Sequence, residues 1–379
     1  MTNRLDQIIK LSNKLFSSYL IKDLQTLVVL SNTSTAELVF KSLKKEKKIG
    51  PVFLLPHAET LPYDFFSPSS YIKNQRMQTF SKLLSSEKIL LVTSIQALMS
   101  PCPEKSHLLP IDVLQTKQVL KRKDFLNSLE ALGYERKQVV NEVGEFSVRG
   151  VIIDIFPTGS INPIRIEIYE DTIESLRLFN PLTQLTTKKI DTFSTLPPQE
   201  YSLSVSGINN FKKNWRALFD VYEEDSEIFK ALSLRKAEEG AEIYLPLFFN
   251  KKTTTLDYLD NFNQIFIEHD SLKEFDKYQM LINDRFEEYR YDIKRPLINP
   301  KDLFLTKDEF RSFVKKRTVK KVKIEAFKTN KKTQLRNETK ARFREGSNAI
   351  PEVNDIVVHL FHGIGIYKGL KKINAKNII

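Results

Sequence analysis

The residues most suggestive of chemistry form a polar turn between an apolar run and a helical pattern, within Leu27–Phe40. Many nucleotide-binding proteins place a phosphate-binding loop here, in which glycines let backbone N–H groups wrap the phosphates and a lysine adds positive charge. The turn Ser31–Thr35 reads SNTST and contains neither residue type. Its hydroxyl groups could hold a stray phosphate at a helix N-terminus, but helix capping is the simpler function.

The second half of a nucleotide site would be an acid that ends a buried strand and holds magnesium. The best candidate is Ile265–Asp270, where the acids are displaced and a histidine intervenes. Cys102 and His107 are close in sequence, but a Pro-Cys-Pro loop is poor support for a catalytic dyad. The five histidines and one cysteine show no zinc-ligand spacing. We therefore predict a chain without catalytic residues, cofactor or metal, which is not an enzyme.

Positive charge is concentrated in one segment near the C-terminal end. Of the net charge of +12, an excess of 11 lies in 315–344, which contains 13 Lys and Arg against two Glu. Such a run is most often a solvated linker or helix face, and less often a contact to DNA or RNA phosphates. The candidate nucleic-acid contacts are Lys315, Lys316, Arg317, Lys320, Lys321 and Lys323.

The elements that would position these residues change character along the chain. Apolar spacing predicts a helix over Leu5–Leu15, and later helices and strands alternate until about residue 110. The expected strands are Leu27–Leu30, Pro51–Leu55 and Ile89–Val92, and the expected helices are Ala36–Leu43 and Asn74–Leu84. Such alternation predicts an α/β fold with a doubly wound parallel sheet.

From about Asp124 the pattern favours an antiparallel sheet. A helix over Phe125–Leu132 ending at Gly133 precedes the expected strands Gln138–Val143, Phe146–Phe156, Ile164–Tyr169 and Thr172–Phe179. In the third strand isoleucines alternate strictly with Arg165, Glu167 and Tyr169. Arg149 lies on a partner strand. The Arg and Tyr side chains on this face have the composition of an interaction hot spot, although an ordinary solvated sheet face is the alternative.

The remaining chain returns to helices with one buried strand. We expect helices over Phe211–Asp220, Glu224–Leu232 and Ser271–Glu288, a strand over Gln264–Glu268, and further strands in Asp355–Leu370. The sequence shows neither a signal-peptide pattern nor an apolar run long enough to span a membrane. With a single cysteine, this composition predicts a cytoplasmic location without membrane contact.

Four blocks of sequence resemble the N-terminal part of transcription-repair-coupling factors. LPHAETLPYDFFSPSSYIKNQRMQTFSKLL (Leu55–Leu84) and GAEIYLPLFF (Gly240–Phe249) resemble the part of that family that mirrors the excision-repair protein UvrB. GEFSVRGVIIDIFPTGSINPIRIEIYEDTIESLRLF (Gly144–Phe179) resembles the UvrA-docking domain, and VVHLFHGIGIYKGL (Val357–Leu370) the start of the RNA-polymerase-interaction domain.

The resemblance implies a family that displaces stalled RNA polymerase with an ATP-driven DNA translocase and recruits UvrA through its UvrB-like module. It also implies that this module has lost its ATP site and that Arg149, Arg165 and Tyr169 match UvrA-contact positions. Docking of UvrA without catalysis is thus the expected function. A nucleic-acid-binding module acting through 315–344 is the alternative.

The resemblance divides the chain into five expected parts. These are a UvrB-like domain 1a with a degenerate nucleotide-binding fold (1–109), an inserted UvrA-docking α+β domain (110–197), UvrB-like domain 1b (198–310), a basic linker (311–350) and the start of the polymerase-interaction domain (351–379). That last domain breaks off at Ile379, which weakens the case for RNA polymerase as a partner. Because the translocase and the C-terminal domain that masks the UvrA surface are missing, we expect a fragment whose UvrA surface is open.

Overall fold

The computed structural model describes residues 25–45, 50–85, 88–109, 113–220, 223–249, 251–322, 356–359, 363–366 and 368. The chain divides into two compact units, Met1–Ile324 and Glu325–Ile379. The helix expected over Leu5–Leu15, Lys323 and the rest of the basic segment to Arg344 lie outside the described residues. Among the described residues, no helix is long and apolar enough to cross a membrane.

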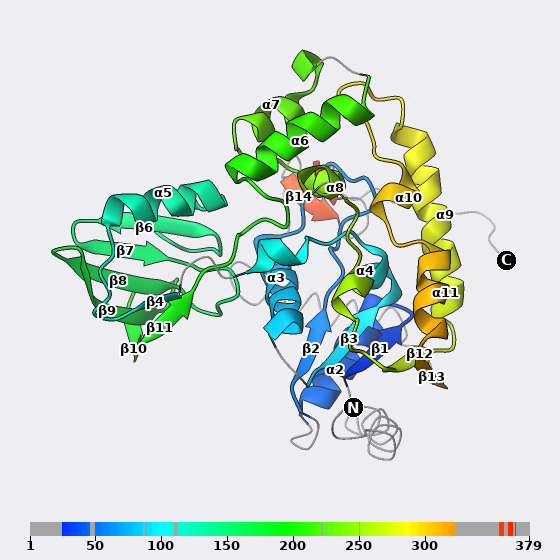
Figure 1. Ribbon diagram of the computed structural model, residues 1–379, viewed down its shortest axis with the longest axis horizontal. Helices are drawn as coiled ribbons and strands as arrows, with labels where there is room; N and C mark the ends of the chain where they lie inside the picture. Colours follow the sequence, from blue (N-terminus) through cyan, green and yellow to red (C-terminus); the bar gives the residue numbers. More distant parts are fainter. Residues whose placement is uncertain are drawn as a thin grey trace. The chain divides into compact units, whose positions relative to one another are not determined.

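A parallel sheet with strand order β13-β12-β1-β3-β2 forms the centre of the first unit (Figure 1). Its strands are β1 (Thr26–Leu30), β2 (Val52–Leu55), β3 (Leu90–Ser94), β12 (Gln264–Glu268) and β13 (Thr318–Val322). Every neighbouring pair is parallel. In β1, β3 and β12 all residues are buried, as expected for a parallel sheet whose two faces are both covered. The predicted α/β fold is confirmed.

Helices cover both faces of this sheet. Helix α2 (Thr33–Lys44) packs Ala36, Val39 and Leu43 on one face, against alternate residues of β1 and β3. On the other face lie α3 (Ser70–Ser85), α4 (Ile95–Met99) and α9 (Ser271–Tyr289). This doubly wound arrangement follows from the period-2 side chains of strands that are apolar on both sides.

Several helices extend the larger core beyond the sheet. They are α6 (Val205–Leu218), α7 (Glu227–Ser233), α8 (Leu245–Phe249), α10 (Pro300–Leu303) and α11 (Lys307–Lys315). Trp215 and Phe211 of α6 lie fully buried, and Phe211 stacks on Phe248 of α8 with ring centroids 4.9 Å apart. Aromatic packing of this kind fixes the helices that follow the antiparallel sheet.

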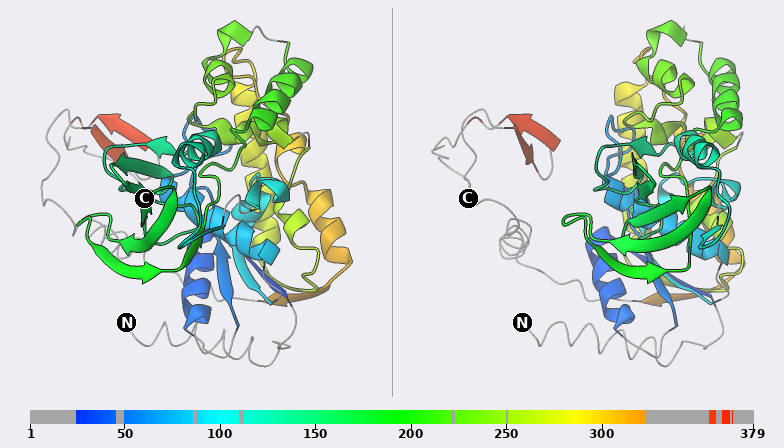
Figure 2. Two further views of the ribbon diagram at one scale, coloured as in Figure 1. Left: turned by 60° about the vertical axis from the view of Figure 1, so that its left-hand side comes forward. Right: turned by 90° about the vertical axis from the view of Figure 1, so that its left-hand side faces the viewer.

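The antiparallel sheet has six strands in the order β10-β9-β8-β7-β6-β5, which curve and twist together (Figure 2). The strands are β5 (Glu135–Arg136), β6 (Glu145–Arg149), β7 (Ile152–Ile155), β8 (Ile164–Tyr169), β9 (Thr172–Phe179) and β10 (Thr186–Ile190). A two-stranded sheet of β4 (Val113–Gln115) and β11 (Thr192–Ser194) joins the ends of this segment. Helix α5 (Arg122–Leu132) packs Phe125 and Leu129 against the buried isoleucines of β7, β8 and β9, which form the isoleucine core. The helix ends at Gly133, whose φ of 96° makes it the predicted C-terminal cap.

Three predictions about these segments are wrong. The stretch Phe146–Phe156 is not one strand, because a turn at Gly150 and Val151 divides it into β6 and β7, and β7 separates Arg149 from β8. Residues 138–143 are not a strand, and Val140 instead packs with Phe156 and Phe179 in a small separate cluster. Residues 311–322 are not a linker, because they complete α11 and form β13, which pairs with β12 at the sheet edge. The second unit contains the strands β14 (Ile356–His359) and β15 (Gly363–Ile366), which pair as an antiparallel hairpin within the stretch predicted to form strands.

A buried ion pair fixes the point where the chain returns from the antiparallel sheet. Nε and Nη2 of Arg76 on α3 donate to the two carboxylate oxygens of Glu200 at 2.5 and 3.1 Å. Nη1 of Arg76 donates to the backbone oxygen of Pro56, and Nη2 to that of Pro101. One guanidinium group therefore links four segments, and both partners of the ion pair are buried.

Candidate functional site

The turn between β1 and α2, which lacks phosphate-binding residues, is stabilised by the protein's own side chains. The Asn32 side chain caps α2 by accepting a hydrogen bond from the backbone N–H of Thr35 at 2.9 Å. The backbone N–H of Ser31 donates to Oε2 of Glu268 at 2.7 Å, and Glu268 is the buried last residue of β12. The Glu268 carboxylate thus accepts a hydrogen bond from a backbone N–H group that, in a nucleotide-binding protein, would donate to a phosphate.

Cys102 and His107 have different partners. Sγ of Cys102 donates to the backbone oxygen of Thr253 at 3.5 Å, and Nε2 of His107 contacts the backbone oxygen of Gln199 at 2.9 Å. Burial raises the pKa of the Cys102 thiol and lowers the pKa of His107. A neutral buried thiol is a poor nucleophile. In the part of the chain that the structure describes, no group of three or more His, Cys, Asp or Glu side chains could hold a metal ion.

The outer face, which is the side of the antiparallel sheet away from α5 and the isoleucine core, contains a fully buried carboxylate. This is Asp154 on β7, directly opposite Arg165 on β8. Oδ1 and Oδ2 of Asp154 accept hydrogen bonds from Nε and Nη2 of Arg165 at 2.7 and 3.0 Å. Nη2 of Arg149 donates to Oδ2 at 2.5 Å. Arg149 and Arg165 therefore share the carboxylate of Asp154, with bidentate geometry at Arg165. We call these three residues the Asp154 cluster.

Arg165 is held on all sides and is less exposed than its alternating position predicted. Its side chain is 18% exposed. The guanidinium carbon lies 4.8 Å from the ring centroid of Phe179, and Nη1 donates to the backbone oxygen of Gln184 at 3.3 Å. Hydrogen bonding to Asp154 raises its pKa, so Arg165 keeps its charge throughout the range in which proteins are stable.

Arg149 and Tyr169 present more of their side chains to solvent. Arg149, at the end of β6, is 50% exposed, and Tyr169, at the end of β8, is 61% exposed. After Tyr169 the chain turns through Glu170 and Asp171, whose φ values of 45° and 59° are typical of a tight hairpin turn. Tyr169 lies four positions along the strand from Arg165, a distance of about 13 Å. The three predicted residues thus lie on one face, with Tyr169 at its margin.

Sequence reasoning did not single out Asp154. A signal was present, because Asp154 is an acid within the apolar run Val151–Phe156 and pairs directly with an arginine-bearing strand. Acids are rarely buried in a strand without a cationic partner. The register that brings Asp154 opposite Arg165 depends on the length of the connection between β7 and β8, which periodicity alone does not give.

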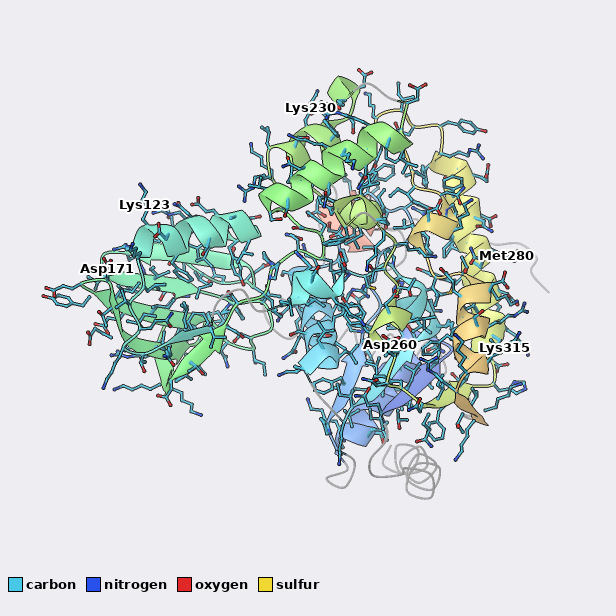
Figure 3. The ribbon with its side chains drawn as sticks, in the orientation of Figure 1. Lys123, Asp171, Lys230, Asp260, Met280 and Lys315 are labelled. Atoms are coloured by element: carbon cyan, nitrogen blue, oxygen red, sulfur yellow. The ribbon has the colours of Figure 1, made fainter. Side chains whose placement is uncertain are left out.

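The predicted nucleic-acid contacts divide into two groups in the structure. Lys315 and Lys316 are exposed at the end of α11 (Figure 3). Arg317 instead has a structural role, since its guanidinium donates to backbone oxygens that include those of Phe262 and Phe313 and stacks 3.6 Å from the Phe313 ring. Lys320 and Lys321 lie on β13, and Lys320 approaches the Phe266 ring at 5.9 Å. Among the described candidates, Arg317 is therefore engaged within the protein, whereas Lys315, Lys316 and Lys321 are exposed.

Comparisons with known proteins place the Asp154 cluster within a recognised domain. Residues 113–201 match the family model of the UvrB interaction domain. The chain is 32% identical to the transcription-repair-coupling factor of Haemophilus influenzae over 293 residues, an alignment that covers 75% of this chain and 25% of that protein. It is 32% identical to the transcription-repair-coupling factor of Escherichia coli over 262 residues, an alignment that covers 68% of this chain and 23% of that protein.

The chain spans about a quarter of the length of these two relatives. The residues that match the UvrB interaction domain run from β4 past β11. They include Arg149, Asp154, Arg165 and Tyr169, and therefore the whole candidate site.

Proposed function

Because the chain is a relative of the transcription-repair-coupling factors and contains a UvrB interaction domain, we propose that it is a non-catalytic docking module for UvrA in transcription-coupled nucleotide excision repair. The observation that carries this proposal is the Asp154 cluster, in which one buried carboxylate orients two arginines on the outer face. The resemblance of Arg149, Arg165 and Tyr169 to UvrA-contact positions supports the same face.

The geometry suits recognition of a protein surface that carries carboxylates. Within the described part of the chain, Arg149 makes one hydrogen bond, of 2.5 Å to Asp154, and it is half exposed, so its remaining N–H groups can donate to a partner. Arg165 is fixed by its hydrogen bonds and by Phe179, which lowers the entropy lost when the partner binds. Tyr169 adds an exposed aromatic ring, a residue type that often dominates interface energy.

We expect Arg149→Ala to weaken equilibrium binding of purified UvrA about 30-fold, because loss of one partner of a charge pair in an interface costs roughly 2 kcal/mol or more. Tyr169→Ala should weaken binding about 10-fold or more through loss of aromatic contact area. Titration of UvrA with the full chain, followed by calorimetry or fluorescence anisotropy, measures both effects.

Lys123→Ala is the matched control, since Lys123 is an exposed cation on α5, on the other side of the sheet (Figure 3). Its affinity for UvrA should equal that of the unmodified chain. No binding of UvrA by the unmodified chain would overturn the proposed function. Binding that survives both Arg149→Ala and Tyr169→Ala would place the docking site elsewhere.

We also infer that this chain does not hydrolyse ATP. The turn after β1 has no lysine to contact phosphates, and the carboxylate of Glu268 is bonded to the turn itself. A nucleotide phosphate would therefore meet a negative charge where hydrolytic sites supply a positive one. Phosphate release in the presence of magnesium and ATP should equal that of a heat-denatured sample. Turnover that persists through repurification and falls in the Glu268→Gln variant would contradict this inference.

A further inference from the structure

Three cations form a row across the outer face on adjacent strands. Arg165 on β8 pairs directly with Arg177 on β9, and Arg177 pairs directly with Lys189 on β10. Directly opposed residues of antiparallel strands share a face of the sheet. Because neighbouring strands lie about 4.8 Å apart, the row extends about 10 Å from the Asp154 cluster to the sheet edge. Figure 1 shows these three strands side by side.

Carboxylates on this part of the face are too few to neutralise its cations. Asp154 is already shared by Arg149 and Arg165. Glu167, in the adjacent row, contacts Arg177 at 3.4 Å and also accepts a hydrogen bond from Oγ of Ser175. Lys189 has no ion pair with the described residues. The two rows therefore combine four cations with two carboxylates, which favours a partner surface of opposite charge.

Arg177 makes only a weak ion pair with the described residues of its own chain. Its side chain is 39% exposed, and its contact to Glu167 is a single long one through Nη2. Its Nε is buried and has no hydrogen-bond partner in the described part of the chain, so the donors open to a partner are those on Nη1 and Nη2. An arginine fork that binds a carboxylate well makes two parallel hydrogen bonds, as Arg165 does with Asp154. Arg177 thus retains donors for an additional carboxylate.

Protection of a sheet edge is the simpler reason for lysines on β10. Charged side chains on an edge strand prevent pairing with other chains, and Lys188 and Lys189 are both exposed on this strand. That reason does not apply to Arg177, because β9 lies between β8 and β10 and has no free edge. The row is also continuous with the Asp154 cluster. We propose that the docking surface extends from the Asp154 cluster through Arg177 to Lys189, and that these two residues bind carboxylates on UvrA.

This extension rests on the proposed function and adds two specificity-determining residues to it. Arg177→Ala should weaken UvrA binding by the full chain about 10-fold, the loss typical of a contributing interface arginine. Lys189→Glu should slow association about 10-fold at low salt, with a smaller effect at high salt, because rim charges act mainly on the association rate. Stopped-flow and equilibrium titrations at two salt concentrations measure both values.

Lys188→Glu is the matched control, because Lys188 lies next to Lys189 on the same strand but pairs with Leu178, a residue packed against the isoleucine core. The same charge change on the opposite side of the strand should leave association within about twofold of the unmodified chain. Equal effects at Lys188 and Lys189 would overturn the proposed row, as would unchanged binding in Arg177→Ala while Arg149→Ala weakens it. No binding by the unmodified chain would overturn the docking function itself and this extension with it.

Discussion

Replacement of Arg76 by alanine is expected to lower the free energy of unfolding by about 3–5 kcal/mol, the usual cost of removing one partner of a buried ion pair. The variant would leave the Glu200 carboxylate buried without a counter-charge. It would also remove the hydrogen bonds that Arg76 donates to the backbone oxygens of Pro56 and Pro101. Because Glu200 lies where the chain returns from the antiparallel sheet, the loss should also loosen the joint between the two sheets.

The surface pair of Arg216 with Glu223 provides the matched control. It has the same two-point arginine–carboxylate geometry, but both side chains are accessible to solvent. Arg216→Ala should change stability little, because exposed pairs lose in desolvation and side-chain entropy most of what they gain. Urea unfolding of both variants measures the difference. If Arg76→Ala is no less stable than Arg216→Ala, the buried pair does not stabilise the joint.

Arg76→Lys separates charge from geometry at the same position. Lysine keeps the positive charge but cannot donate simultaneously to Glu200, Pro56 and Pro101 in the plane of a guanidinium group. We expect stability between that of the unmodified chain and that of Arg76→Ala. This variant also keeps the comparison informative if the alanine variant does not fold.

Sequence periodicity predicted the strands that are apolar on one face and polar on the other, or apolar on both faces. The strands Ile164–Tyr169, Thr172–Phe179 and Gln264–Glu268 have the predicted bounds, since strict alternation or a short apolar run identifies a strand directly. It failed for β13, whose sequence TVKKV reads as part of a basic run. Partial exposure at the sheet edge permits those lysines, so composition concealed a strand that pairs over its whole length with β12.

The sequence predicted only those features of the site that lie within a single strand. Alternation within β8 placed Arg165 and Tyr169 on one face, but the acid that binds Arg165 comes from another strand. The same limit applies to Glu268 and Ser31, which are 237 residues apart in the sequence and meet through the order of the parallel sheet. Both contacts depend on register and strand order, which are long-range properties. Sequence patterns identified the arginines, whereas the fold identified what holds them.

The Asp154→Asn variant should lose both stability and affinity for UvrA, although Asp154 is fully buried and cannot touch a partner. Asparagine has nearly the same shape but leaves Arg165 and Arg149 without their shared counter-charge. We expect the free energy of unfolding to fall by about 2–4 kcal/mol, less than for a fully buried pair because Arg149 can reach water. Binding should weaken about 10-fold through faster dissociation, since arginines that are no longer fixed lose more entropy on binding.

Ile166→Val distinguishes a positioning effect from general destabilisation. Ile166 lies beside Arg165 on β8 but points into the isoleucine core, so the shorter side chain should cost about 1 kcal/mol of stability and leave binding unchanged. Binding is compared at a temperature at which circular dichroism shows all variants folded. If Asp154 only stabilises the sheet, its folded variant will bind UvrA as tightly as Ile166→Val does. If Asp154 orients the arginines, the folded Asp154→Asn protein will dissociate faster, and Arg149→Ala will then weaken it less than it weakens the unmodified chain, because the two substitutions act on one shared contact.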